Sequence, residues 1–289
     1  MASLADVLAR SLDPNHSGAE VAENVKMLPP APGAQHSVDE IAYTRTRVVN
    51  VPKALLRENR VISGFAPGPI VDAYKIMCIQ TLQRLRALNG NALAVVSPGR
   101  HEGKTLTAIN LALSFAQEVD QTVLLVDANL REPSVHRYFG FTPEAGLSDY
   151  LLSGTPLDRI LVNPGVERFV ILPGGRPLLN SAEMLGSAKM EKLVQELKMR
   201  YPSRLVIFDL SPVLSVADAL AFAPYVDAAL MVAQEHKTRR QDIVRAAEML
   251  RAVELIGTVL NMAGEASQGA HVARKPGHGW FRRLARRRE

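Results

Sequence analysis

The sequence lacks several features that mark disulfide-rich, membrane-spanning or secreted proteins. Of its 289 residues only Cys78 is a cysteine, which excludes an internal disulfide. It has no run of about 18 apolar residues, because the nearest stretch, 220–233, is short and contains Asp227. Asp6 and Arg10 interrupt the one apolar stretch at the N-terminus, unlike a signal peptide. We therefore expect a cytoplasmic protein.

Excess positive charge is confined to one end of the chain. The net charge is +5, but residues 271–289 hold seven Lys or Arg and one Glu, so this segment carries +6 and the rest −1. A broad nucleic-acid-binding surface is therefore not expected. Residues 274–288 place Trp280 and Phe281 among arginines, which suits contact with an anionic membrane surface. A solvated tail is the alternative.

The composition changes along the chain predict three parts. Residues 1–66 hold an apolar pattern of helical spacing near the start, a Pro-rich stretch around 29–33 and signals for a short strand and helix. We expect this part to be an N-terminal extension and linker without a core of its own. Residues 67–265 are expected to form the main domain, and residues 266–289 a basic C-terminal tail.

The main domain alternates apolar runs of strand length with helical stretches. Strands are expected at 92–97, 122–127, 169–172, 205–210, 228–233 and 256–260, and helices at 70–88, 104–119, 188–200 and 238–250. The strands are almost wholly apolar, which is typical of parallel strands covered on both faces. The pattern predicts an α/β fold with a mostly parallel central sheet in three layers.

A glycine-bearing loop joins the first expected strand to a helix. The segment from Val95 to Thr105 ends in Gly-Lys-Thr, in the strand–loop–helix context that a phosphate-binding P-loop requires. Loop amides and the helix N-terminus hold phosphates, Lys104 would reach the β- and γ-phosphates, and Thr105 would bind Mg²⁺. Pro98 stands where the strict pattern has its first glycine, with Gly99 beside it. A chance Gly-Lys-Thr at a helix start is the alternative.

Two further strands end in an aspartate. Val-Leu-Leu-Val is followed by Asp127, and Leu-Val-Ile-Phe is followed by Asp209. The carboxyl ends of strands are where open α/β sheets bind ligands, and carboxylates there hold Mg²⁺ directly or through water. The alternative is that each acid only ends a strand.

The order of these motifs resembles the bacterial tyrosine kinases of capsule and exopolysaccharide assembly, in the MinD-like branch of P-loop NTPases. The chain has a P-loop, then Asp-Ala-Asn-Leu-Arg at 127–131, then Asp-Leu-Ser-Pro at 209–212, and the stretches 146–149, 172–175, 180–187 and 257–261 agree as well. The resemblance covers about residues 67–263.

The resemblance implies roles for individual residues and Mg-ATP as the ligand. The nucleotide-binding residues would be Gly99, Arg100, His101, Glu102, Gly103, Lys104, Thr105, Leu106, Asn129 and Asn261, with Asn261 near the adenine. The catalytic residues would be Lys104, Asp127, Asp209 and Arg131, and the metal-binding residues Thr105, Asp127 and Asp209. Chemistry of this kind rests on positioning and charge neutralisation around the γ-phosphate.

The chain departs from the family pattern at several positions. Asn129 replaces the usual second Asp, and Ser211 replaces a proline. The family's oligomerisation motif, Glu-x-x-Arg-x-x-Arg, aligns with Asp72, Lys75 and Cys78, which puts ring assembly by that route in doubt. No tyrosine follows Tyr225, so we expect no autophosphorylation on a C-terminal tyrosine cluster.

These features together predict an ATP-binding, tyrosine-kinase-like regulator of exopolysaccharide or capsule polymerisation and export. Its expected partner is the cytoplasmic segment of a membrane copolymerase, and its expected place is the inner face of the plasma membrane; a homo-oligomer is left open. Two alternatives are a MinD-like membrane-associating ATPase without protein kinase activity and a non-catalytic nucleotide-binding adaptor.

Overall fold

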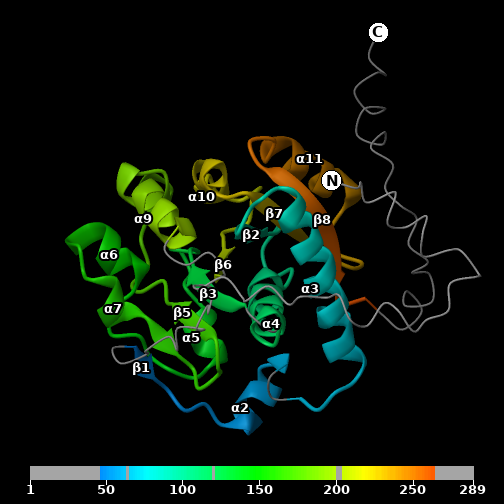
Figure 1. Ribbon diagram of the computed structural model, residues 1–289. Helices are drawn as coiled ribbons and strands as arrows, with labels where there is room; N and C mark the ends of the chain where they lie inside the picture. The colour runs from blue at the N-terminus through cyan, green and yellow to red at the C-terminus, as the bar shows by residue number, and fades with distance from the viewer. Residues whose placement is uncertain (1–45, 63–64, 119–120, 200–203, 264–289) are drawn as a thin grey trace, which may run out of the picture. The chain divides into compact units, whose positions relative to one another are not determined.

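A computed structural model gives the fold of residues 46–62, 65–118, 121–199 and 204–263. Eight strands form one sheet in the order β1-β4-β5-β3-β6-β2-β7-β8 (Figure 1). Every pairing is parallel except that between β4 and β5. The strands are β1 (Arg47–Val48), β2 (Ala92–Val96), β3 (Thr122–Asp127), β4 (Val162–Asn163), β5 (Phe169–Leu172), β6 (Arg204–Asp209), β7 (Ala228–Gln234) and β8 (Glu254–Asn261). The expected mostly parallel sheet is confirmed.

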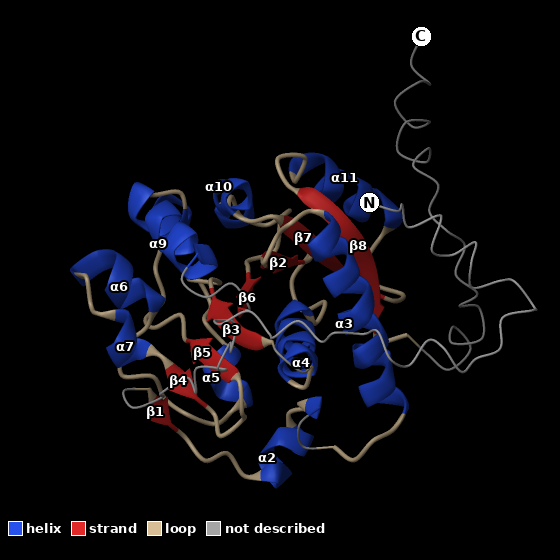
Figure 2. Cartoon of the chain, in the orientation of Figure 1, coloured by secondary structure: helices blue, strands red, loops and turns tan. Residues whose placement is uncertain are grey.

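Helices cover both faces of this sheet (Figure 2). The described α-helices are α2 (Lys53–Glu58), α3 (Pro69–Ala87), α4 (Lys104–Ala116), α5 (Val135–Tyr138), α6 (Leu147–Ser153), α7 (Leu157–Ile160), α8 (Ser181–Leu185), α9 (Ala188–Met199), α10 (Asp218–Phe222) and α11 (Arg240–Met249). A short 3₁₀ helix, Ala223–Tyr225, follows α10. All six expected strands and all four expected helices are present, within a few residues of their predicted ends. The shorter elements were not all expected, because one or two turns give little periodicity.

The alternation of side chains along the strands builds two separate cores. On β2, Leu93 and Val95 pack on the face that α3, α4 and α5 cover, whereas Ala92, Ala94 and Val96 pack on the face that α8, α9 and α10 cover. All five β2 residues are buried. Successive side chains of a strand point to opposite faces, so a strand buried on both sides must be apolar throughout. This is the three-layer arrangement expected from the sequence.

Residues 47–62 pack on the main domain. Strand β1 pairs with β4, and Leu56, Val61 and Ile62 are buried in the core beside α4 and α5. The expected short helix after Pro52 is α2. The side chains of this segment thus contribute to the core of the main domain. The predicted N-terminal helix, the linker and the basic tail lie outside the described residues.

Helix α3 carries the three positions that align with the family's oligomerisation motif. Asp72 and Lys75 are exposed and form an ion pair with 3.9 Å between Oδ1 and Nζ, whereas Cys78 is fully buried. Such an exposed pair one turn apart contributes at most about 1 kcal/mol. Among the described helices, α3 included, none is both long enough and apolar enough to span a membrane.

Candidate active site

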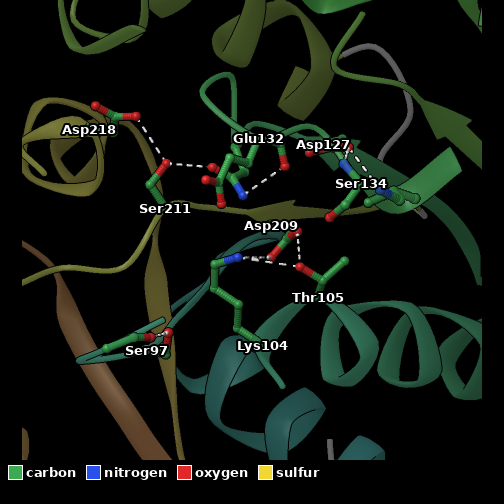
Figure 3. Close-up of polar contacts among 12 residues, drawn as sticks. Ser97, Lys104, Thr105, Asp127, Glu132, Ser134, Asp209, Ser211 and Asp218 are labelled. Atoms are coloured by element: carbon green, nitrogen blue, oxygen red, sulfur yellow. Dashed lines mark hydrogen bonds and ion pairs between the residues drawn. The ribbon is translucent and has the colours of Figure 1, made fainter. Parts of the chain in front are cut away.

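Two aspartates lie next to each other at the carboxyl edge of the sheet. Asp127 ends β3 and Asp209 ends β6, and the two residues are direct partners in the register of these neighbouring parallel strands. Both are fully buried. Figure 3 shows Asp209 beside the start of α4, with Asp127 across from it. The sheet therefore brings together two acids that lie far apart in the sequence.

The P-loop between β2 and α4 brings a cation and a hydroxyl to Asp209. Lys104 Nζ lies 3.7 Å from Asp209 Oδ1, and Thr105 Oγ1 donates a hydrogen bond of 2.7 Å to Asp209 Oδ2. Gly103 precedes the helix with φ +90°, a backbone conformation that glycine adopts without strain. A Cβ at this position would also collide with Asn261 Nδ2. Glycine is thus required here for two independent reasons.

Each of the two aspartates keeps one oxygen without a hydrogen-bond partner in the described structure. Asp127 Oδ2 accepts the backbone N–H groups of Ser134 and Val135 at 2.8 and 3.0 Å, but Oδ1 has no donor. Asp209 Oδ1 likewise has only the Lys104 ion pair, which is too long for a hydrogen bond. Buried carboxylate oxygens are normally satisfied, so two orphans at one edge indicate a place for a ligand.

Burial and mutual repulsion alter the acidity of the pair. Loss of solvation is the main cause that raises the pKa of Asp127 to about 7, and the negative charge of Asp209 adds to it. Burial also raises the pKa of Asp209, against the opposing effects of the Lys104 charge and the Thr105 hydrogen bond. Two close carboxylates cannot both ionise freely, so burial and repulsion together favour a proton on the pair.

The P-loop is held from outside by the loop between β7 and α11. Glu102 is only 4% exposed, and its carboxylate accepts the N–H of Gly99 at 2.8 Å and the hydroxyl of Thr238 at 2.6 Å. Lys237 Nζ donates to the carbonyl of Arg100 at 2.8 Å, and Asn261 Nδ2 donates to the carbonyl of Glu102 at 2.9 Å. The side chain of Glu102 therefore stabilises the conformation of the P-loop through its hydrogen bonds with Gly99 and Thr238.

Asn129 and Ser211, the two departures from the family pattern, contact each other. Ser211 Oγ lies 2.7 Å from Asn129 Oδ1 and 2.9 Å from Asp218 Oδ2, so one hydroxyl proton is shared between two acceptors. Asn129 Nδ2 donates to the carbonyl of Glu132 at 3.1 Å. Both ends of the amide are thus used within the protein, and the two substitutions form one structural unit.

Asp218 extends this unit to Arg131, one of the predicted catalytic residues. It is fully buried, accepts the hydroxyl of Ser181 at 2.9 Å and lies 3.4 Å from Arg131 Nε. Asp218 comes from the start of α10 and Ser181 from the start of α8. Arg131 is therefore oriented by a buried carboxylate that the sequence motifs did not identify; Figure 3 shows Asp218 beside Ser211.

A cavity of about 1300 Å³ opens over these groups. Of the predicted nucleotide-binding and catalytic residues, those that line it are Arg100, His101, Gly103, Lys104, Thr105, Leu106, Asn129, Arg131 and Asn261. Gly99, Glu102, Asp127 and Asp209 are not among its lining residues. Arg60, Tyr74, Ser134, Arg137 and Tyr138 also line it, and no local motif marked these five. A ligand in this cavity would meet the P-loop from one side and α2 and α5 from the other.

We predict that Thr238→Val loosens the P-loop, whereas Thr238→Ser leaves it intact. Valine has nearly the same shape but cannot donate to the buried carboxylate of Glu102, and losing a hydrogen bond to a charged group costs about 1.5–3 kcal/mol. Urea unfolding should show this loss for valine. Hydrogen exchange of the amides at 98–104 should also become faster.

The serine variant is the matched control because it keeps the hydroxyl. Equal amide exchange in wild type and Thr238→Val would mean that the Glu102–Thr238 contact does not hold the loop. Lower stability of the serine variant alone would instead point to the packing of the Thr238 methyl group.

The known proteins that this chain resembles in sequence include several bacterial tyrosine-protein kinases. Tyrosine-protein kinase YwqD of Bacillus subtilis is 34% identical over 178 residues, which are 61% of this chain and 73% of that protein. A putative tyrosine-protein kinase in the cps region of Klebsiella pneumoniae is 32% identical over 173 residues. The match covers 59% of this chain but only 24% of the Klebsiella protein. No protein-family model matches the chain.

Solved structures agree with the fold. The kinase domain of Escherichia coli tyrosine kinase ETK superposes with a TM-score of 0.64 at 24% identity, covering 80% of this chain and 93% of that one. The VpsO kinase domain gives 0.61 at 27% identity, covering 67% and 96%. The cell division ATPase MinD of Pyrococcus furiosus gives 0.50 at 21% identity, covering 59% and 71%, a likeness of fold alone. Because the match to YwqD extends over most of that protein, the chain belongs to the family of bacterial tyrosine-protein kinases.

Proposed function

We propose that this chain transfers the γ-phosphoryl group of Mg-ATP to tyrosine side chains of proteins in a capsule or exopolysaccharide system. The observation that carries the proposal is the pair of buried acids, Asp127 and Asp209, each with an unpartnered oxygen opposite Lys104 and Thr105. The 34% identity to the Bacillus kinase supports the choice of tyrosine as acceptor.

The residues at this edge suit Mg²⁺ bound together with a nucleotide. Within the described residues no three His, Cys, Asp or Glu side chains gather into a site that could hold a metal unaided. Mg²⁺ usually takes one or two carboxylates, with phosphate and water oxygens completing its shell. Asp209, Asp127 and the Thr105 hydroxyl supply such oxygens, and the ion would neutralise charge on the phosphates.

The remaining side chains would orient the reaction. Lys104 and the P-loop amides hold the phosphates, and Arg131 faces the same cavity from the other side. Asp127 would accept the tyrosine proton while the phenolic oxygen forms its bond to the γ-phosphorus and the bond to the β-phosphate oxygen breaks, releasing ADP. Burial raises the pKa of Asp127, which favours uptake of a proton by this carboxylate.

The kinase proposal is favoured over a MinD-like ATPase. The likeness to MinD is one of fold at 21% identity, whereas the likeness to tyrosine kinases extends to sequence. A nucleotide-binding adaptor is disfavoured because the sequence relatives are named tyrosine-protein kinases.

The proposed setting is the inner face of the plasma membrane, beside the cytoplasmic segment of a membrane copolymerase. The region similar to this chain makes up only 24% of the Klebsiella relative, whereas it makes up 73% of the Bacillus relative. Residues 274–288 would add attraction to anionic lipid.

The proposal is tested by titrating Mg-ATP into the full chain in a calorimeter and by assaying phosphotyrosine formation on a tyrosine copolymer. Lys104→Ala should weaken nucleotide binding by about tenfold or more, because it removes a charge-assisted contact to phosphate. Lys192→Ala, an exposed lysine on α9, is the control.

Absence of heat and of any thermal shift at saturating Mg-ATP would refute nucleotide binding and with it the proposed function. Nucleotide binding with ADP release but no phosphotyrosine would favour the ATPase alternative. Nucleotide binding without ADP or phosphotyrosine would favour the adaptor.

A further inference from the structure

The cavity over the P-loop is larger than a nucleotide requires. Its volume is about 1300 Å³, whereas pockets for small ligands span roughly 300–1,000 Å³. Its lining continues past the P-loop to α2, to Phe65 and to Tyr74 on α3. A second ligand therefore has room beside the first, and the residues of this extra part indicate what that ligand is.

The strand order shows on which side of the phosphates the extra space lies. Along the carboxyl edge, Asn261 ends β8, the P-loop follows β2, Asp209 ends β6 and Asp127 ends β3. The resemblance to the kinase family implies that the adenine lies near Asn261, in which case the γ-phosphate would point toward β3. An acceptor hydroxyl attacks in line, from the side opposite the β-phosphate. The acceptor must therefore enter past α5, which follows β3.

Helix α2 is fixed against α4 and α5 at this acceptor side. Asn59 Nδ2 donates to the carbonyl of Tyr138 at 3.0 Å, and the buried amide of Asn110 on α4 bonds the carbonyl of Arg60 and the N–H of Ile62. Figure 2 shows α2 below α4, with α5 to one side. These hydrogen bonds fix a turn in which Arg60 has a left-handed conformation with φ +59°, which a non-glycine residue rarely adopts.

Two cations on this side, Arg60 and Arg137, differ from the others in having no counter-charge in contact in the part of the chain that the structure describes. Of the other Lys and Arg residues that line the cavity, Lys104, Arg100 and Arg131 pair with Asp209, Glu132 and Asp218 respectively, and Arg57 on α2 has a contact as well. Arg60 and Arg137 flank the Asn59–Tyr138 contact, and within the described residues no acceptor contacts either guanidinium.

We propose that Arg60 and Arg137 form a subsite for the acidic residues that flank a target tyrosine in a partner protein. The proposal rests on the proposed function and names its substrate class. Phe65, 39% exposed, and Tyr74 give the same part of the cavity an apolar side for the tyrosine ring. The chain's own residues 271–289, with a net charge of +6, do not match this subsite.

The test measures binding of a fluorescent peptide, a tyrosine flanked by glutamates, to the full chain with a non-hydrolysable Mg-ATP analogue. The double variant Arg60→Glu/Arg137→Glu should bind the peptide about tenfold or more weakly, because attraction becomes repulsion. A peptide with glutamine in place of glutamate should bind weakly to wild type and double variant alike. The KM for the glutamate peptide in phosphotransfer should rise in parallel.

Two control variants make the result specific. Arg60→Lys/Arg137→Lys keeps the charge and should retain most of the binding. Arg251→Glu carries the same charge reversal beyond α11, just before the amino end of β8 and therefore at the opposite edge of the sheet. The positive φ at position 60 costs lysine and glutamate about as much as arginine, so both double variants should fold, which thermal melting verifies.

The outcomes separate this inference from the proposed function. No binding of the nucleotide analogue to wild type would refute the proposed function. Nucleotide binding with equal peptide affinity in wild type and double variant, or equal affinity for the glutamate and glutamine peptides, would overturn the subsite alone. Binding of phosphatidylserine vesicles through Arg60 and Arg137 in place of the peptide would overturn it as well.

Discussion

Replacing Asp127 with asparagine should stop phosphotransfer and at the same time stabilise the ligand-free protein at pH 8. Asparagine has the same shape, and its Oδ1 can accept the two N–H groups of Ser134 and Val135 that Oδ2 of the aspartate now accepts. Its NH₂ group then takes the place of the unpartnered oxygen. Losing the proposed base should lower turnover by roughly a hundredfold to ten-thousandfold.

The stability gain follows from the raised pKa of Asp127. In the unfolded chain this carboxyl ionises near its ordinary pKa of 3.8, whereas in the folded protein it ionises at about 7. The folded state therefore binds one more proton between these pH values, and wild-type stability falls as pH rises from about 4 to 7. Above pH 7 the folded protein carries the full cost of a buried charge, which asparagine does not have.

Thermal unfolding at two pH values measures the effect. At pH 8 the variant should be more stable by roughly 1–3 kcal/mol, or by several degrees in Tm. At pH 4.5, where the wild-type carboxyl is also neutral in the folded protein, the difference should shrink. Asp72→Asn on the exposed side of α3 is the control and should show no such pH dependence. If the stability difference between the variant and the wild type were the same at both pH values, burial would not raise the pKa of Asp127.

The same aspartates show what a sequence pattern can predict. Asp127 and Asp209 each follow an apolar run, and parallel strands bring their carboxyl ends to one edge, so the local pattern predicts that they meet. The P-loop is predictable for the same reason, since its glycine, lysine and threonine are neighbours in the chain. Local signals thus give the sheet, the loop and the two acids.

Contacts between single polar residues are beyond such patterns. Asp218 resembles an ordinary acid in the first turn of a short helix, and only the packing of α8 and α10 buries it against Ser181, Ser211 and Arg131. Arg60 likewise joins the site only because Asn110 fixes its turn. These positions lie far apart in sequence, and no periodicity links them.

One signal in the sequence did point to the buried network. Asn129 and Ser211 both depart from the pattern of the family, and the structure places them 2.7 Å apart. An aspartate at position 129 would lose the donor that now reaches the carbonyl of Glu132 and would face that oxygen with a negative charge. The joint change at positions 129 and 211 is therefore consistent with their contact in the structure. A double-mutant cycle on Asn129 and Ser211 measures the coupling energy between the two side chains.

The second large effect is expected for Asp218→Ala. The truncation leaves the hydroxyls of Ser181 and Ser211 without this acceptor and removes the counter-charge of Arg131. Each buried polar group left unsatisfied costs about 1–3 kcal/mol, whereas Arg131, 35% exposed, can be solvated in part. We expect a loss of about 2–4 kcal/mol in the free energy of unfolding, measured in urea.

Asp218→Asn separates packing from charge at this position. It keeps an acceptor for the two serines but not the negative charge beside Arg131, so it should recover much of the stability and little of the turnover. A double-mutant cycle of Asp218→Ala with Arg131→Ala gives the coupling between the two side chains, expected at about 1 kcal/mol or more because the carboxylate is fully buried. Additive effects on both stability and turnover would mean that Asp218 does not aim Arg131, and that the arginine finds its place in the cavity without it.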